Sequence, residues 1–520
     1  MPQVLDCTLR DGGYYTGWDF DPDDVRQYLH SVSRLPISYV EVGYVNDPAD
    51  GYAGEYNYLT PERLREIRAI LREDQRLVVM IDGKNCTPER IPAMFAPYVG
   101  LADLVRITVA PKAVDHGIAL GRALKSSDFQ VGFNVMYLST FQDDLSILQP
   151  AVDAADAFDS IALVDSYGGC LPTSVAPLFT ELRELLPGKV LGFHGHDNMC
   201  LAFANTLAAI STGADVVDGT FAGMGRGAGN LRTETVLIHL AGAEDGDLDF
   251  QALSRATEPF EKLRPIYEWG TNLPYMLSGA NNLPQKDVMD WLSKSRYSVS
   301  SIVEALRRQS GSAADESDHQ ALTPESFDGS TVLIIGGGES VPRHQDALTR
   351  LVEKNAPLVL FSSARHLGLS SRLGGTQLLC LPGHDAARVT LAEGLSGLDA
   401  LVVPTPPRVA GCLPDGVQKP AFQAEPLHLA DDASLGPVPD TGPLALALGA
   451  AKALGATRVL LAGFDGYPMA SSSEQAMSRE TEATIAKFQS GTPDVELLSV
   501  TPSSYDVRQG SVYALVAAID

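Results

Sequence analysis

Short apolar runs alternate with longer amphipathic stretches through the first half of the chain. The stretch 61–72 has apolar residues at helical spacing, which is typical of a helix that packs one face on a sheet. We expect strands in eight apolar runs, at residues 3–8, 38–44, 77–82, 103–108, 129–136, 159–165, 189–195 and 214–219. Eight strands that alternate with helices over about 240 residues favour a parallel sheet closed as a (β/α)8 (TIM) barrel. An open, doubly wound sheet is the alternative.

The pattern is interrupted at residues 309–329, which are rich in Ser, Asp, Glu and Gly and have no apolar period. Such a composition is typical of a linker. Apolar runs resume beyond it, and a helix of small residues is expected over 441–456. The pattern of this C-terminal part predicts a Rossmann-like α/β domain. The expected division is a barrel at 1–265, a helical extension at 266–308, a linker at 309–329 and the α/β domain at 330–520.

Composition narrows the class of protein. Hydrophobic residues make up 45% and charged residues 20% of the chain, as in an ordinary globular protein. The 39 basic and 65 acidic residues give a net charge of −26, which disfavours nucleic acid and anionic membranes as partners. No apolar run is long enough for a spanning helix, no signal peptide is evident, and the six cysteines lack CxxC spacing. We expect a cytoplasmic protein that binds neither nucleic acid nor membrane.

Polar side chains occur at the end of nearly every expected barrel strand. They include Arg10 and Asp11, Glu41, Arg106, Asn134, Asp165 and Ser166, and His194 and His196. Catalytic groups of such barrels lie at the carboxyl ends of the strands, so this pattern predicts an active site there.

His194 and His196 are two residues apart on an expected strand, so both imidazoles point to the same face. Asp11 follows strand 1, which a closed barrel places beside strands 7 and 8, and it can supply a third ligand. Two imidazoles and a carboxylate suit a divalent metal, Mn²⁺ or Mg²⁺ first, with Co²⁺ and Zn²⁺ as alternatives. A pair of hydrogen-bonded core histidines is the plain alternative.

The glycine-rich run 223–230 follows the last expected strand. Its spacing does not match a dinucleotide fingerprint. We interpret it as a tight loop that brings Asn230 close to the metal.

Four motifs in order, L-D-C-T-L-R-D-G-G (5–13), G-F-H-G-H-D-N (192–198), G-A-D-V-V-D-G-T (213–220) and G-M-G-R-G-A-G-N (223–230), resemble the DRE-TIM metallolyases. Over about residues 3–300 the chain is most similar to the 4-hydroxy-2-oxovalerate aldolase branch of that family. The resemblance implies a metal-dependent barrel that works through the enolate of a 2-oxo acid.

The resemblance also implies roles for individual residues. Asp11, His194 and His196 would hold the divalent metal, and Arg10 would stabilise the enolate. The substrate-binding residues would be Asp165 and Ser166 beside the pyruvate carboxylate, Arg106, and Asn230 near the metal.

One position departs from the family pattern. The bacterial aldolases carry a His shortly after R-D-G, whereas this chain continues with Tyr14 and Tyr15. A phenol, with a pKa near 10, is a weak general base unless its surroundings change it. The base could be Tyr14, Glu41 or a water on the metal, or the reaction could differ, and Tyr14 could be only an aromatic wall of the pocket.

In the second domain, Gly336, Gly337 and Gly338 follow an apolar run, and Thr441 and Gly442 precede the small-residue helix. Both features are typical of turns that bind a phosphate, which predicts a nucleotide or nucleotide-sugar site. The domain weakly resembles archaeal pterin diphosphokinase-like and sialyltransferase-like proteins. A structural turn in a docking domain is the alternative.

The leading hypothesis is a metal-dependent lyase that forms or cleaves a carbon–carbon bond through a pyruvate enolate. Its aldehyde partner would be sugar-like or another aldehyde of polysaccharide or natural-product biosynthesis. The alternatives are a Claisen-type acyl-CoA condensing enzyme, similar to the citramalate and homocitrate synthases, and a barrel scaffold with a nucleotide-binding domain. We expect a homo-oligomer, a dimer.

Overall fold

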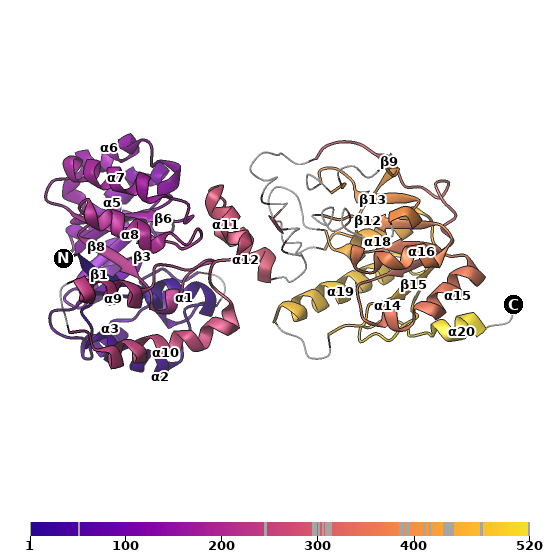
Figure 1. The fold of residues 1–520 in the computed structure, drawn as a ribbon, viewed down its shortest axis with the longest axis horizontal. Helices are drawn as coiled ribbons and strands as arrows, with labels where there is room; N and C mark the ends of the chain where they lie inside the picture. Colours follow the sequence, from indigo (N-terminus) through magenta and orange to yellow (C-terminus); the bar gives the residue numbers. More distant parts are fainter. Residues whose placement is uncertain are drawn as a thin grey trace. The chain divides into compact units, whose positions relative to one another are not determined.

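The computed structural model describes residues 2–49, 52–243, 247–293, 315–383, 395–408, 412–414, 418–429, 441–467 and 472–517, with residues 299, 302, 303, 306 and 389. The chain forms two compact units, Met1–Val288 and Met289–Asp520. Figure 1 draws both units as a ribbon coloured by position in the sequence, from indigo at the N-terminus to yellow at the C-terminus. In the described part of the chain, no helix has the length and apolar character needed to cross a membrane.

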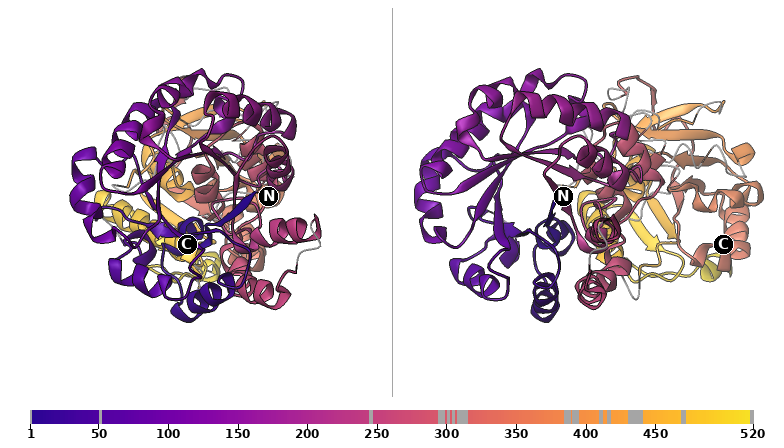
Figure 2. Two further views of the ribbon diagram at one scale, coloured as in Figure 1. Left: turned by 90° about the vertical axis from the view of Figure 1, so that its left-hand side faces the viewer. Right: turned by 60° about the vertical axis from the view of Figure 1, so that its left-hand side comes forward.

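The first unit is a closed barrel of eight parallel strands in sequence order, which confirms the predicted fold. The strands are β1 (Gln3–Asp6), β2 (Tyr39–Tyr44), β3 (Arg76–Ile81), β4 (Leu104–Val109), β5 (Gln130–Val135), β6 (Ser160–Asp165), β7 (Val190–Gly195) and β8 (Val216–Gly219). Pairing of β1 with β8, with Val4 opposite Val217, closes the ring. Figure 2 shows helices surrounding this ring of strands.

The helices follow the strands as the apolar pattern predicts. They are α1 (Thr8–Thr16), α2 (Pro22–Val32), α3 (Pro61–Arg68), α4 (Ile91–Phe95), α5 (Val114–Lys125), α6 (Gln149–Asp153), α7 (Pro172–Leu185), α8 (Ala202–Ser211) and α9 (Thr233–Ala243). In α5, Val114, Ile118, Gly121 and Leu124 are buried, three or four residues apart, so one face packs on the barrel. The barrel is followed by α10 (Phe250–Tyr267), α11 (Leu273–Ala280) and α12 (Gln285–Ser293).

Helix α1 begins directly after β1, so the strand ends at Asp6, two residues before the predicted end. Gly12 lies against the loop that follows β8, and a Cβ atom there would lie 2.6 Å from the Sδ of Met224. A larger residue would push α1 away from this loop. The glycine therefore lets α1, which carries Arg10 and Asp11, pack closely at the mouth of the barrel.

The second unit is an eight-stranded parallel sheet, which confirms the predicted α/β class. The strands, in spatial order, are β16 (Glu496–Ser499), β15 (Arg458–Ala462), β10 (Thr331–Ile335), β11 (Leu358–Phe361), β12 (Gln377–Cys380), β13 (Ala400–Pro404), β14 (Ala421–Ala424) and β9 (Gln320–Ala321). The chain leaves β10 toward β11 and later returns to its other side as β15. The carboxyl end of β10 is therefore the point where the strand order reverses, a usual ligand site in such sheets.

Helices cover both faces of this sheet. They are α14 (Ser340–Arg343), α15 (Gln345–Asn355), α16 (Ser370–Leu373), α18 (Pro443–Ala453), α19 (Ser472–Gly491) and α20 (Val512–Ala517). Val332 and Ile334 belong to the apolar cluster that α18 and α19 complete, whereas Leu333 and Ile335 belong to the cluster on the α15 face. A strand that is apolar on both sides forms the centre of a doubly wound sheet.

The segment predicted as a linker, 309–329, is in part folded. Gln320 and Ala321 form the edge strand β9, and Leu322 is buried in the core of the second unit. Asp315 also forms an ion pair of 2.9 Å with the buried Arg408. The prediction is therefore wrong for 315–329, because an edge strand pairs through its backbone and needs no apolar period. Residues 309–314 lie outside the described part.

Candidate active site

A cavity of about 310 Å³ opens at the carboxyl ends of the barrel strands. Its wall includes Arg10 and Asp11 from α1, Asn134 from β5, Ser166 after β6, His194 from β7 and His196 directly after it. Residues from all eight strands or their following loops therefore converge on one space. This is the position predicted for the active site.

Asp11, His194 and His196 come together in this wall. Their ligand atoms all lie within 4.8 Å of one another, and the two imidazole centroids are 5.1 Å apart. Asp11 is held in the first turn of α1, His194 lies in β7, and His196 directly follows that strand. The structure thus brings together the three residues that the sequence predicts as ligands.

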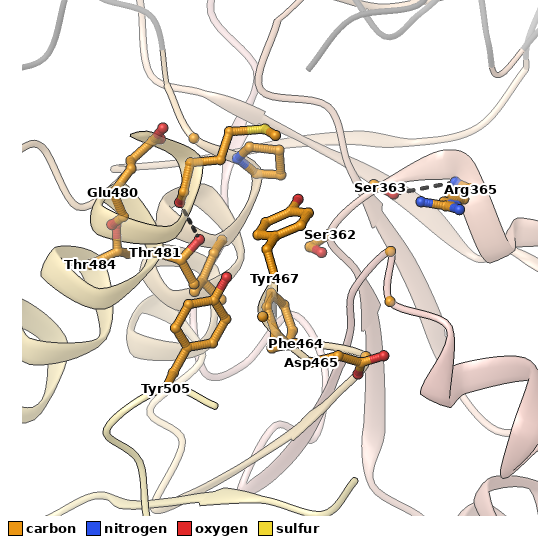
Figure 3. Close-up of a pocket in the computed structure, with 18 of the residues that line it drawn as sticks. Ser362, Ser363, Arg365, Phe464, Asp465, Tyr467, Glu480, Thr481, Thr484 and Tyr505 are labelled. Carbon is orange, nitrogen blue, oxygen red and sulfur yellow. Dashed lines mark hydrogen bonds between the residues drawn. The ribbon is translucent and has the colours of Figure 1, made fainter. Parts of the chain in front are cut away.

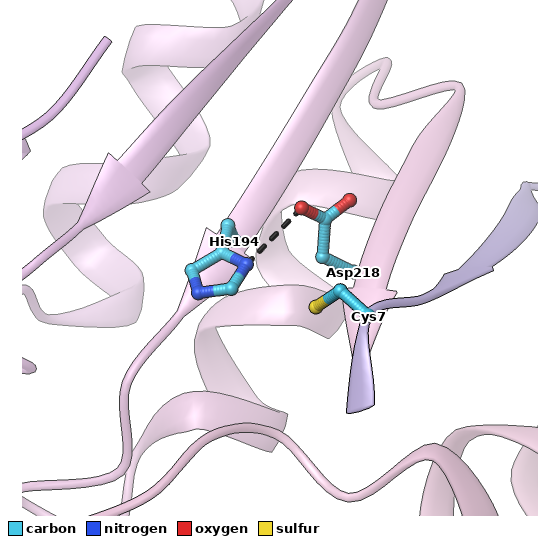
Figure 4. Close-up of side chains that lie close together, drawn as sticks. All are labelled: Cys7, His194 and Asp218. Atoms are coloured by element: carbon cyan, nitrogen blue, oxygen red, sulfur yellow. Dashed lines mark hydrogen bonds and ion pairs between the residues drawn. The ribbon is translucent and has the colours of Figure 1, made fainter. Parts of the chain in front are cut away.

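Each imidazole is oriented by a hydrogen bond on the side away from Asp11. His194 Nδ1 lies 3.1 Å from a carboxylate oxygen of Asp218, and His196 Nδ1 lies 2.9 Å from the backbone oxygen of Asp165. Because both oxygens can only accept, each Nδ1 carries the proton and each Nε2 is left for a cation. Figure 4 shows His194 directed at Asp218, with the thiol of Cys7 beside them.

The donor set fits a divalent cation. Asn230 donates from Nδ2 to Asp11, and its Oδ1 is buried without a hydrogen-bond partner among the described residues. A buried carbonyl oxygen without a partner costs about 1–3 kcal/mol, which a cation beside it would offset. Two imidazole nitrogens, a carboxylate and an amide oxygen form a mixed nitrogen and oxygen set suited to such an ion.

Electrostatics hold two of the three candidate ligands, His196 and Asp11, in the forms that bind a cation. Burial lowers the pKa of His196 to about 4, so this imidazole is neutral near neutral pH. Burial alone would raise the pKa of Asp11, but Arg10 and His194 lower it well below its ordinary value. The carboxylate is therefore ionised, as a metal ligand must be.

A chain of buried charges lies behind the ligands. Arg10 donates from Nε to Glu41 over 2.7 Å, and Arg106 donates from Nη1 to the other oxygen of Glu41, also over 2.7 Å. Arg106 reaches Asp218 over 2.6 Å through Nη2. These contacts link Arg10 through Glu41 and Arg106 to Asp218, which orients His194.

This network of buried charges corrects the predicted roles of Glu41 as a base and of Arg106 as a substrate-binding residue. Glu41 is fully buried, does not line the cavity, and has both oxygens bound by arginines, so it is not placed to act as a base. Arg106 lines a smaller space inside the barrel and gives its donors to Glu41, Asp218 and Asn134. Glu41 is the buried carboxylate that balances the facing guanidinium groups of Arg10 and Arg106. Arg106 in turn holds Asp218, so both residues orient side chains of the site.

Asp165 and Ser166 also have different roles. The carboxylate of Asp165 accepts from the backbone N–H groups of Gly169 (3.2 Å) and Cys170 (3.0 Å) and does not line the cavity, so its predicted contact with a substrate carboxylate is wrong. Ser166 does line the cavity, and its Oγ accepts from the backbone N–H of Tyr137 over 2.9 Å. Asp165 instead stabilises its own loop and orients His196 through its carbonyl.

Tyr14 lines the cavity where the family pattern has a histidine. Its hydroxyl lies 3.2 Å from the hydroxyl of Tyr44, and the guanidinium carbon of Arg226 lies 3.9 Å from its ring centroid. The hydroxyl and the aromatic wall are thus both at the site, and the geometry alone leaves both roles open.

Among the residues of the site that escape the sequence prediction are Asp218, Arg226, Gln285 and Lys286. Asp218 had a signal, because β8 places it in register with His194. Arg226 is hidden inside a glycine-rich run. Gln285 and Lys286 begin α12, far along the chain from the barrel motifs, and no local pattern connects them to it.

The second unit has a larger cavity, of about 720 Å³, at the carboxyl ends of β10, β11 and β15. Gly337, Gly338 and Gly442 line it, whereas Gly336 and Thr441 do not. Gly336 packs against β15 instead, since a Cβ there would lie 2.6 Å from the carbonyl oxygen of Gly463. Figure 3 shows Thr481 and Thr484 on one side of this cavity, Ser362 and Ser363 on the other, and the ring of Tyr467 between them.

A (β/α)8 barrel with two histidines and an aspartate at its mouth is the architecture of a barrel metalloenzyme, and comparisons with known proteins identify the family. A family model described as HMGL-like matches residues 108–259. Oxaloacetate decarboxylase of Mycobacterium tuberculosis is 31% identical over 241 residues, 46% of this chain and 70% of that relative. The chain therefore belongs to the HMGL-like (DRE-TIM metallolyase) family.

Further similarities agree with this assignment. 4-Hydroxy-2-oxovalerate aldolase of Pelotomaculum thermopropionicum is 28% identical over 263 residues, 49% of this chain and 75% of that relative. The crystal structure of the N-terminal domain of a candidate aldolase from Bacteroides vulgatus is 43% identical, with a TM-score of 0.55. It covers 58% of this chain and 99% of its own. The predicted resemblance is confirmed for the first unit.

Proposed function

We propose that the first unit is a divalent-metal-dependent aldolase that forms or cleaves a carbon–carbon bond through the enolate of a 2-oxo acid such as pyruvate. The observation that carries this proposal is the convergence of Asp11, His194 and His196 with Arg10 in one cavity wall. The names of the relatives support it, because cleavage of a 4-hydroxy-2-oxo acid and decarboxylation of oxaloacetate both break the bond between C3 and C4. Both reactions leave negative charge on the 2-oxo oxygen.

Arg10 is the residue that would stabilise this charge. Its Nε and Nη1 are held by Glu41 and Asp11, and its Nη2 makes no hydrogen bond within the described residues. A fixed guanidinium with one free edge is a preorganised donor for a developing oxyanion. A bound divalent cation, Mn²⁺ or Mg²⁺, would polarise the 2-oxo group and add positive charge at the same point.

Tyr14 is the residue that would exchange the proton. In the synthetic direction, C3 of the enolate attacks the aldehyde carbon, the C–C bond forms, and the enolate returns to the 2-oxo group. The aldehyde oxygen, now an alkoxide, takes a proton from the Tyr14 hydroxyl. Cleavage runs these steps backward. Of Tyr14 and Glu41, only Tyr14 lines the cavity, and its hydroxyl faces that of Tyr44.

Cleavage of 4-hydroxy-2-oxovalerate by the metal-loaded enzyme tests the proposal, with pyruvate and acetaldehyde as measured products. Activity should require the cation, and Tyr14→Phe, which keeps the ring, should lower turnover about 10²-fold or more. Tyr58→Phe is the control, because that tyrosine lies outside the cavity wall. Unchanged cleavage by Tyr14→Phe would leave Tyr14 as a wall of the pocket.

Decarboxylation is the second candidate, and the 31% identical oxaloacetate decarboxylase favours it. The same preparation should be given oxaloacetate, with pyruvate release corrected for the metal-catalysed background. Faster pyruvate release from oxaloacetate than from 4-hydroxy-2-oxo acids would favour this reaction. The Arg10 and metal-site requirements would be the same, since the two reactions share the enolate.

For the second unit we propose a nucleotide or nucleotide-sugar ligand. Its cavity lies where the strand order reverses, and the N-cap of α18 is Gly442, with no side chain to satisfy the first backbone N–H groups. A panel of nucleotides should raise the melting temperature of the full chain. Gly442→Glu, which puts a negative charge at that helix start, should abolish the shift. No shift with any nucleotide would favour a docking domain.

A further inference from the structure

The charges on the barrel cavity wall are unusual for so acidic a chain. The chain carries 65 acidic and 39 basic residues, yet the wall includes three cations, Arg10, Arg226 and Lys286, and one carboxylate, Asp11. Arg10 and Asp11 form an ion pair with each other. The two remaining cations therefore face the cavity without a carboxylate in its wall to balance them.

Arg226 has no anionic partner in the part of the chain that the structure describes. Its guanidinium is half-buried and lies over the ring of Tyr14. Many other arginines of the first unit pair with carboxylates, such as Arg63 with Glu55 and Arg183 with Asp215. A half-buried guanidinium stacked on an aromatic ring keeps its donors available, which is how arginine recognises carboxylate and phosphate groups.

The backbone around Arg226 is closely fixed. Gly227 has a φ of +62°, and a Cβ atom there would overlap the side-chain oxygen of Gln285. A Cβ atom at Gly225 would overlap the side-chain amide of Asn230. Glycines on both sides thus let the loop pass between Asn230 and Gln285, and they set the position from which Arg226 enters the cavity.

Lys286 is placed by its neighbour. Gln285 is buried and donates from Nε2 to the carbonyl oxygen of Ser166 over 3.0 Å and to the side chain of Asn198 over 2.7 Å. These bonds hold the start of α12 at the cavity. Lys286, the next residue, lines the wall and has no ion pair among the described residues.

A pair of tyrosine rings also lines the wall. The rings of Tyr137 and Tyr167 stack with centroids 5.3 Å apart and an interplanar angle of 30°. Tyr137 has a φ of +64°, a conformation that side-chain-bearing residues rarely adopt, and Ser166 holds its backbone N–H. Such strain persists where the surroundings impose it, often at binding sites. Stacked rings suit the apolar face of a carbohydrate-like molecule.

We infer that the acceptor aldehyde of the proposed aldol reaction carries an anionic group, a carboxylate or a phosphate, that Arg226 and Lys286 bind. This inference rests on the proposed function and names the class of its second substrate. Arg10 and the metal ligands serve the 2-oxo acid, so the two cations from the loop after β8 and from α12 are left for the second molecule. The acceptor is thus an acidic or phosphorylated aldehyde, and the tyrosine pair favours a sugar-like body.

The test uses the full-length, Mn²⁺-loaded enzyme with pyruvate and two matched acceptor pairs. Glyceraldehyde 3-phosphate is compared with glyceraldehyde, and succinic semialdehyde with butanal. The kcat/KM should favour the anionic member of at least one pair by about 10-fold or more, since a hydrogen bond to a charged group has that effect. The pair with the larger ratio identifies phosphate or carboxylate as the group.

Variants then assign the effect to residues. Arg226→Gln should lower this ratio about 10-fold through KM, Lys286→Gln should lower it less, and Arg226→Lys should restore part of it. Arg122→Gln is the control, because Arg122 is exposed and pairs with Asp156 at the surface.

Three results would overturn the inference. An equal kcat/KM for charged and neutral acceptors would do so, as would equal losses for both in Arg226→Gln. Loss of pyruvate deuterium exchange by Arg226→Gln, in proportion to its loss of aldol activity, would assign Arg226 to the pyruvate carboxylate instead. Absence of exchange in the wild-type enzyme is a different failure, because it would overturn the proposed function itself.

Discussion

Single residues give the site its chemistry through their hydrogen-bond partners. His194 is oriented by Asp218, which Arg106 binds in turn, and Glu41 joins Arg106 to Arg10. The candidate metal ligands and Arg10, which we propose stabilises the enolate, therefore share one buried network. A change in a residue that touches no substrate should alter the metal site.

Asp218→Asn removes the charge that orients His194. We expect metal affinity to fall about 10- to 100-fold, as is usual when a hydrogen-bond partner of a ligating histidine is changed. Calorimetric titration of Mn²⁺ into the metal-free protein measures this. Asp143→Asn, at an exposed position of the first unit, should bind the metal as the wild type does. Wild-type affinity in Asp218→Asn would show that β7 alone orients His194.

Arg10→Lys keeps the positive charge but loses the planar fork that contacts both Glu41 and Asp11. We expect turnover to fall about 10²-fold or more. Steady-state cleavage of the 4-hydroxy-2-oxo acid is the measurement, and Arg26→Lys, at an exposed helix position, is the control. Turnover close to wild type in Arg10→Lys would place the stabilising group elsewhere.

Sequence reasoning predicted the three residues that the structure brings together, Asp11, His194 and His196, but not the network behind them. Two histidines two residues apart on a strand have a direct geometric consequence, and Asp11 follows from closure of the ring. Glu41, Arg106 and Asp165 were assigned to chemistry because they occur at strand ends. Their partners lie on other strands, and a single sequence does not show which buried charges face one another.

Among the elements, the barrel strands follow the apolar pattern to within one or two residues at most ends. The second sheet is less evident, because β12, β14 and β16 have only four residues each and no alternation to mark them. The edge strand β9 was assigned to a linker. Pairing on both sides does not make a strand evident, because β12 and β14 each lie between two neighbours. A very short strand gives too few residues for a pattern.

Glu234, in the first turn of α9, should make the stability of the protein depend on pH. Burial raises the pKa of Glu234 to about 7 from an ordinary value of 4.5, and this outweighs the attraction of Arg232, which is 40% exposed. The folded state therefore binds the proton more tightly than the unfolded state. Its contribution to stability is complete below pH 4.5 and is lost as the pH rises through 7, by on the order of 3 kcal/mol.

Glu234→Gln, which mimics the protonated side chain, should remove this term. The melting temperature of the variant should exceed that of the wild type at pH 8, and the difference should shrink toward pH 5. Glu62→Gln, on the exposed face of α3, controls for the general effect of removing a charge. A difference that does not change with pH would show that Glu234 is ionised in the folded protein.

On the scale of the whole molecule, the two units have separate cores and separate cavities. The described contacts of the barrel site all come from residues up to Lys286. We therefore expect a fragment of residues 1–308 to fold and to form the enolate. The second unit would then bind its own ligand and take no part in enolate formation.

A shorter fragment, 1–265, is the matched comparison, since it ends where the sequence predicted the barrel to end. It lacks Gln285, which bonds to Ser166 and Asn198, and Trp269, whose indole N–H donates to the carbonyl of Ala222 over 3.0 Å. We expect it to melt at a lower temperature and to be less active than 1–308. Equal melting and activity of the two fragments would show that α11 and α12 are dispensable.

The most direct test of the central claim is exchange of the pyruvate methyl protons in deuterated water, followed by NMR. It needs no knowledge of the aldehyde, because enolate formation alone labels the methyl group. We predict that the Mn²⁺-loaded wild-type protein catalyses exchange. Chelation should abolish it, and so should His194→Ala combined with His196→Ala in a protein that remains folded. Exchange that persists in the folded double variant, or its absence from the metal-loaded wild type, would contradict the account.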